Sequence, residues 1–263
     1  MTVFVTADKA RIVPASIRLD PKAVLPLHAE LYLMAHDDDT GELLINDQTL
    51  AFGLAGALLL ELSLKGYVAV GYVYHDFHRE WQAQPGRLTV CRSGPTGSTP
   101  LDSALATVEQ LVRAQRSGDQ LRAWLREFAA ADLYERVRAA MVAVGLLQRS
   151  ERRRLGGLVR TETHLAVHYG YAVRARAHIR DAVRYHSQHG GVRRAAPDDE
   201  CVALCGLVGA LELAEFLYDG SLSTRDLTQW LWHVVTKHEN PSLTAVVQAV
   251  DAGRGDLAVA AMR

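Results

Sequence analysis

The stretch that most constrains the fold is Leu50–Val70, which reads LAFGLAGALLLELSLKGYVAV. Small residues fill its first half and leucines its second, and Glu61 is its single acid. A helix that is apolar nearly all round belongs inside a protein, where small residues let neighbouring backbones approach closely. Gly66 stands where a helix takes a left-handed cap, and the apolar residues after it favour a strand. We therefore expect a buried helix that ends near Gly66, with the rest of the chain packed around it.

Composition limits the classes of protein that the chain can belong to. Its 263 residues are 49% hydrophobic and 22% charged, and the formal net charge of -1 argues against a general polyanion binder. Three cysteines without a CxxC pair indicate free thiols in a reducing cytosol. Met1–Asp8 lacks the basic start and long apolar run of a signal peptide, and Glu61 interrupts the best candidate for a membrane span. We expect a cytoplasmic protein whose membrane contact, on the inner face, is peripheral.

The order of periodic segments predicts one mainly α domain with small β-hairpins. Residues 1–24 lack periodicity and are expected to form an arm, residues 25–252 the domain and residues 253–263 a tail. No linker rich in Pro, Gly or Ser divides the chain. The expected helices cover residues 27–35, 50–65, 101–116, 120–128, 132–144, 164–187, 201–217, 224–237 and 242–252. The expected strands cover 67–74, 87–91, 146–147 and 158–163, with the basic residues 148–154 in the loop between the last two.

A weak internal repeat joins a helix, a glycine and a hairpin twice. Leu58–Val70 has a helix, Lys-Gly and an apolar strand start, and Val137–Gln148 has a helix, Val-Gly and Leu-Leu. This outline is that of a winged helix, so a nucleic-acid binder with Arg152–Arg154 as its wing is an alternative. Because the candidate recognition helices are apolar, we do not expect nucleic acid as the partner.

The chain carries no sequence motif of an enzyme or a metal site. It has no phosphate-binding loop, no GxGxxG after a strand and no GxSxG. His164 and His168 have the spacing of zinc-binding histidines but lack the glutamate of HExxH, and Asp37–Asp39 lacks the alternation of a calcium loop. Cys201 and Cys205 share one face of an apolar helix, as small core residues do. We expect no catalytic residue, no metal and no cofactor.

Arginines are concentrated in about one sixth of the chain. Residues 151–194 hold ten arginines and three acids, and Arg174, Arg176, Arg180 and Arg184 fall on one helical stripe. Such a patch attracts the phosphates of lipid headgroups or of nucleic acid. The alternative is a solvated face that is balanced by acids elsewhere in the fold.

The order of several motifs resembles the Golgi phosphoprotein 3 family. These motifs are Leu27–Met34 (LHAELYLM), the Asp-Asp-Thr-Gly turn, Asn46-Asp47 and GLAGALLLELSLKGYV, followed by the second helix–glycine unit and a helix from Asp198. The likeness covers roughly Leu25 to Ala249, and the Arg- and Ala-rich composition is similar to a bacterial branch. The resemblance implies a helical domain without enzymatic activity. Eukaryotic members are peripheral Golgi proteins that bind phosphatidylinositol 4-phosphate in a basic pocket and help to retain glycosyltransferases.

The resemblance also implies where ligands would bind. Ile45 stands at the tryptophan of the lipid pocket and Ala55 at its arginine, and two further basic positions fall near Ala131 and Tyr134. The candidates for lipid-headgroup binding here are Arg136, Arg138 and Arg174.

A self-association hairpin of some family members would fall at Arg152–Thr163. Its candidate residues are Arg152, Arg153, Arg154 and Leu158. The expected partners are an anionic phospholipid or phosphoinositide headgroup, further copies of the chain in a homo-oligomer, and other proteins. The predicted function is a non-enzymatic peripheral membrane adaptor, with a nucleic-acid-binding or purely protein-interaction module as the alternative.

Overall fold

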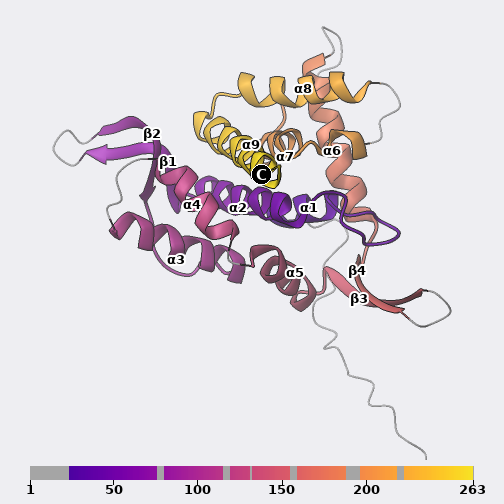
Figure 1. Ribbon diagram of the computed structural model, residues 1–263. Helices are drawn as coiled ribbons and strands as arrows, with labels where there is room; N and C mark the ends of the chain where they lie inside the picture. The colour runs from indigo at the N-terminus through magenta and orange to yellow at the C-terminus, as the bar shows by residue number, and fades with distance from the viewer. Residues whose placement is uncertain are drawn as a thin grey trace, which may run out of the picture.

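The computed structural model describes residues 24–75, 80–114, 119–130, 132–154, 159–187, 196–217 and 222–262. In this part of the chain, α-helices and two antiparallel two-stranded sheets alternate, which confirms the predicted mainly α domain with small hairpins. The elements, drawn in Figure 1, are α1 (Leu27–Met34), α2 (Asp47–Leu64), β1 (Val68–His75), β2 (Glu80–Val90), α3 (Thr99–Arg113), α4 (Gln120–Ala129), α5 (Leu133–Ala143), β3 (Leu147–Arg154), β4 (Val159–Ala166), α6 (Gly170–Ser187), α7 (Asp199–Ala210), the 3-10 helix η2 (Leu213–Phe216), α8 (Thr224–Lys237) and α9 (Pro241–Ala261).

Helix α2 forms the centre of the fold, as its apolar sequence predicts. It runs through the middle of the molecule in Figure 1 and contacts α1, α3, α4, α5, α7 and α9. A Cβ at Gly56 would lie 2.5 Å from Val250 Cγ2, so the small residue permits the close approach of α9. Within the described ranges, α2 is the one helix long and apolar enough to cross a membrane, and 72% of that stretch is buried in the protein. The burial identifies it as a core helix.

The helix–glycine–hairpin repeat is present twice. Gly66 follows α2 with φ +72° and Gly145 follows α5 with φ +77°, a left-handed conformation that glycine adopts without steric cost. After each glycine the chain closes the helix with a backbone bond, from Tyr67 N–H to Leu62 O and from Leu146 N–H to Met141 O, both 2.9 Å. A hairpin follows in each case. Because α2 is buried on all sides, the first unit offers no recognition helix for a DNA groove.

Three predicted helices differ from the structure by six residues or more at one end. Residues 164–169 are not helical, because β4 continues its pairing with β3 up to Ala166, which lies opposite Leu147. The predicted helix 201–217 stops at Ala210, and Glu212 turns the chain with φ +58° into η2, where Leu213 is fully buried. Helix α9 continues to Ala261, well past the predicted end at residue 252, while the predicted arm lies outside the described residues except for Val24.

The first hairpin is also longer than expected. Strand β2 begins at Glu80, so Trp81 lies in the strand and not in the connecting loop. Cross-strand pairing with β1 extends as far as His75 and Glu80. This pairing supplies backbone hydrogen bonds that the polar sequence of the segment did not indicate.

Candidate functional site

A hollow of about 420 Å³ is lined by Tyr134, one of the positions that the resemblance assigns to the lipid pocket. The first turns of α2 contribute Asp47, Gln48, Ala51 and Phe52 to its lining, and the start of α5 contributes Tyr134. We call this cavity the α2–α5 hollow; its remaining lining residues are Arg126, Ala129, Ala130, Asp132, Leu133, Glu135 and Leu257.

The charge of the α2–α5 hollow does not suit a phosphate. Three acids, Asp47, Asp132 and Glu135, line it together with one arginine, Arg126. That arginine lies 3.4 Å from Asp256 Oδ2, which offsets part of its charge. Carboxylates that line the same hollow raise the free energy of an anion bound there. Ala55, at the family's arginine position, is fully buried, and Ala131 lies outside the described residues.

Tyr134 is held in place by a stack of three rings. The His36 ring lies 4.1 Å from the Tyr32 ring and 5.9 Å from the Tyr134 ring, and the two tyrosine rings lie 5.8 Å apart, so the three centroids form a triangle. Burial lowers the pKa of His36 to about 4, so the ring is neutral at pH 7. Its Nδ1–H therefore donates to the Tyr32 carbonyl at 2.7 Å, and its Nε2 accepts from the Tyr134 hydroxyl at 3.0 Å. The tyrosine at the family's basic position thus forms part of the wall and faces the interior of the protein.

The three predicted headgroup residues do not converge on one pocket. Arg136 donates to Ser103 Oγ at 2.9 Å and lies 5.0 Å from the Phe128 ring. Arg138 forms an ion pair with Glu135 and lies 5.3 Å from the Tyr134 ring.

Arg174 lies on a different element, α6. Its charge lowers the pKa of Glu30 on α1, against the larger opposing effects of burial and Glu200. Each of the three arginines therefore meets a different part of the fold, and their role in lipid binding stays a prediction.

The acidic turn before α2 pairs with the arginine stripe of α6. Arg176 makes a two-pronged ion pair with Asp38, at 2.5 and 3.1 Å. Asp37 accepts the backbone N–H groups of Asp39 and Thr40 at 3.1 and 2.7 Å, as in a structural turn. A second hollow of about 430 Å³ contains Arg176 and Arg180 together with all three aspartates. Acids from another segment thus lie beside two of the four arginines of the stripe, Arg176 and Arg180, in agreement for these two with the alternative interpretation.

The two strands of the β3–β4 hairpin carry a second group of arginines. At its base Arg149 pairs with Glu162 at 2.5 Å. Further out, Arg152, Arg153 and Arg154 lie opposite Thr161, Arg160 and Val159 in the strand register, and Leu158 lies outside the described residues. The hairpin projects from the body of the protein in Figure 1. Its predicted part in self-association stays a prediction.

The histidine and cysteine pairs of the sequence do not form a reactive cluster. His164 lies in β4, 3.4 Å from Glu162, whereas His168 precedes α6, so neither lies in the helix that was predicted to begin at residue 164. Contact with Cys201 and complete burial raise the pKa of the Cys205 thiol well above its ordinary value. Among the described residues, no group of three His, Cys, Asp or Glu side chains is arranged to hold a metal ion.

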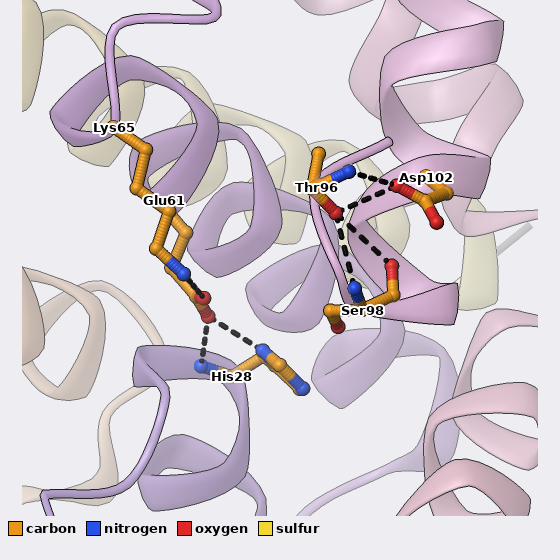
Figure 2. A network of polar contacts seen from close by, with 6 residues as sticks. All are labelled: His28, Glu61, Lys65, Thr96, Ser98 and Asp102. Carbon is orange, nitrogen blue, oxygen red and sulfur yellow. Dashed lines mark hydrogen bonds and ion pairs between the residues drawn. The ribbon is translucent and has the colours of Figure 1, made fainter. Parts of the chain in front are cut away.

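A buried polar network surrounds Glu61 near the end of α2, and the sequence indicated it only through this acid in an apolar helix. Figure 2 shows Glu61 between His28 and Lys65. Its Oε1 accepts the backbone N–H of His28 at 2.9 Å and the ring Nδ1–H at 2.5 Å, and Lys65 Nζ lies 3.6 Å from Oε2.

A separate polar turn, also drawn in Figure 2, precedes α3. There Thr96 donates two hydrogen bonds to Asp102 Oδ1, one from its backbone N–H and one from its hydroxyl, each 2.7 Å long. These bonds lower the pKa of Asp102 and fasten the start of α3.

Glu30 on α1 has a raised pKa, so we expect the stability of the protein to depend on pH. Burial, Glu200, Asp198 and Glu61 together raise its pKa from 4.5 to about 7, with Arg174 opposing them. Between these values the folded state holds a proton that the unfolded state releases, so the free energy of unfolding falls as the pH rises from about 4.5 to 7. We expect Glu30→Gln to stabilise the protein by about 2 kcal/mol at pH 8 and to change little at pH 4.5. Urea unfolding of both proteins at the two pH values measures this, and an equal gain at both would contradict it.

The geometry defines a mainly α domain in which two helix–glycine–hairpin units surround one buried helix. The family profile described as Golgi phosphoprotein 3 (GPP34) matches residues 27–252. The chain therefore belongs to the Golgi phosphoprotein 3 family, a family of non-enzymatic adaptors. No curated protein matches the chain.

Proposed function

We propose that this protein is a non-enzymatic peripheral membrane adaptor that binds anionic phospholipid by charge. The observation that carries the proposal is the concentration of arginines on the projecting β3–β4 hairpin. Its two strands hold five arginines, Arg149, Arg152, Arg153, Arg154 and Arg160, and two glutamates, Glu151 and Glu162. Each arginine near an anionic membrane surface contributes about 1 kcal/mol to binding. An excess of three therefore gives the hairpin a useful affinity without a shaped pocket.

The proposal does not assign a phosphorylated inositol as the specific ligand. The α2–α5 hollow has three acids and one arginine, and the family's tryptophan and arginine positions hold Ile45 and Ala55. We expect vesicles with phosphatidylinositol 4-phosphate to bind no better than vesicles with phosphatidylglycerol at equal total charge. A clear preference for the phosphoinositide would instead indicate a headgroup pocket.

Vesicle co-sedimentation tests the hairpin directly. The triple variant Arg152→Ser/Arg153→Ser/Arg154→Ser is expected to bind phosphatidylcholine–phosphatidylglycerol vesicles at least about tenfold more weakly than the unmodified protein. The matched control is Arg113→Ser/Arg122→Ser/Arg225→Ser, which removes the same charge from exposed side chains on α3, α4 and α8. The control is expected to keep most of the affinity.

The mass of each variant in solution is measured alongside, because the same hairpin is the predicted self-association element. Equal binding of the unmodified protein to neutral and anionic vesicles would overturn the proposal. If the unmodified protein binds neither kind of vesicle and the hairpin variant loses self-association, the result would favour a purely protein-interaction module.

A further inference from the structure

The outer part of the first hairpin exposes a pair of aromatic rings. Tyr74 on β1 and Trp81 on β2 lie directly opposite each other in the strand register. Their ring centroids are 5.4 Å apart with the ring planes tilted by 58°, and the residues are 41% and 49% exposed. Two large rings in contact with each other, and with nearly half of their surface in water, form a small apolar patch on the hairpin.

The base of this hairpin is well fastened to the body. The Leu88 N–H donates to Gln120 Oε1 of α4 at 3.1 Å, and Val70 and Leu88 are both buried. Past a shift of register between Val70 and Tyr72, the Thr89 hydroxyl donates to the Tyr72 carbonyl at 2.8 Å. The outer strands then project from one end of the molecule in Figure 1, opposite the end that carries β3–β4. The aromatic pair is therefore presented on a supported arm.

We infer that the Tyr74–Trp81 pair is a contact with the interface of a lipid bilayer. Tyrosine and tryptophan have an apolar ring and a polar O–H or N–H, and they concentrate where acyl chains meet headgroups. This inference rests on the proposed function and adds to it a second, uncharged point of attachment at the other end of the fold.

The size of the pair favours a bilayer over another protein chain. A fully buried aromatic side chain covers roughly 150–250 Å², so two half-exposed rings offer less than about 250 Å² of new contact. A stable protein interface needs about 800 Å² from each partner. A bilayer needs no complementary surface, and ring insertion adds to the attraction of nearby charges.

Quenching of tryptophan fluorescence by brominated acyl chains tests the inference. The chain has four tryptophans, of which Trp124 is fully buried and Trp230 and Trp232 pack against the core. With phosphatidylcholine–phosphatidylglycerol vesicles that carry brominated chains, we expect quenching in the unmodified protein and its loss in Trp81→Phe. We also expect Tyr74→Ser/Trp81→Ser to bind the same vesicles roughly tenfold more weakly. Tyr169→Ser/Tyr185→Ser, at residues 62% and 40% exposed elsewhere, is the matched control and should keep its affinity.

The outcomes separate this inference from the proposed function. Salt-sensitive binding to anionic vesicles without quenching of Trp81 would overturn the inference and leave the proposed function standing. Absence of binding to anionic vesicles would overturn both. A Tyr74→Ser/Trp81→Ser variant with altered mass in solution and unaltered vesicle affinity would assign the pair to a contact between copies of the chain, and would also overturn the inference.

Discussion

Glu61→Ala is expected to lower the free energy of unfolding by about 3 kcal/mol, because it leaves buried polar groups without partners. Glu61 is 3% exposed and His28 is 5% exposed. The carboxylate accepts two hydrogen bonds from His28, one of them from the backbone N–H in the first turn of α1. Pro26, the N-cap of α1, makes no side-chain cap. Glu61 therefore caps α1 from a neighbouring helix and joins the two helices, and its loss is measured by urea unfolding at pH 7.

Three further variants show which contact matters. Lys65→Ala should cost less than about 1 kcal/mol, because the lysine side chain is 45% exposed and its pairing is screened. Glu61→Gln keeps an oxygen acceptor for the backbone N–H and should cost less than Glu61→Ala. His28→Ala and His28→Ala/Glu61→Ala complete a double-mutant cycle with Glu61→Ala. We expect this cycle to give a coupling free energy of about 1–3 kcal/mol between the two side chains. A coupling near zero would show that His28 and Glu61 contribute independently.

Gly206→Leu is expected to prevent folding, because three helices meet at this glycine. A Cβ here would lie 2.6 Å from Val247 Cγ2 on α9 and 2.8 Å from Val235 Cγ2 on α8. Both valines are fully buried, and a β-branched side chain in a helix has one strongly preferred rotamer, so neither can turn away. Overpacking by one methyl costs about 1–3 kcal/mol, and the three further carbons of leucine have no space at all.

Two glycine-to-alanine variants test the close packing at Gly206 quantitatively. Gly206→Ala should destabilise by about 1–2 kcal/mol, since the gain in helix propensity offsets part of the overpacking. Gly255→Ala, in α9 with nothing within 4 Å of the added Cβ, should stabilise by up to about 1 kcal/mol. Unfolding in urea followed by circular dichroism gives both values. If Gly206→Ala and Gly255→Ala changed the free energy of unfolding in the same direction, the lack of space around Gly206 would not be the cause of the effect.

The second hairpin shows where sequence periodicity was insufficient. His164 to Tyr169 has an apolar and aromatic composition that suits a helix or a strand of this length. In the structure, this segment continues as a strand because β4 pairs with β3 as far as Ala166. Likewise the acids of the α2–α5 hollow come from the separate segments at Asp47, Asp132 and Glu135, and only packing shows that they share one surface.

The sequence by itself determined that Leu50–Val70 holds a buried helix ending at a left-handed glycine, because apolar periodicity and caps depend on neighbours within a few residues. It also determined the helix–glycine–hairpin repeat and the family, which depend on the order of such local signals. The tertiary structure alone decided the use of Glu61 as the cap of α1, 33 residues away, and the pairing of Arg176 with Asp38, 138 residues away. Contacts at such separations depend on how helices pack around α2, and residue spacing along the chain carries no record of that packing.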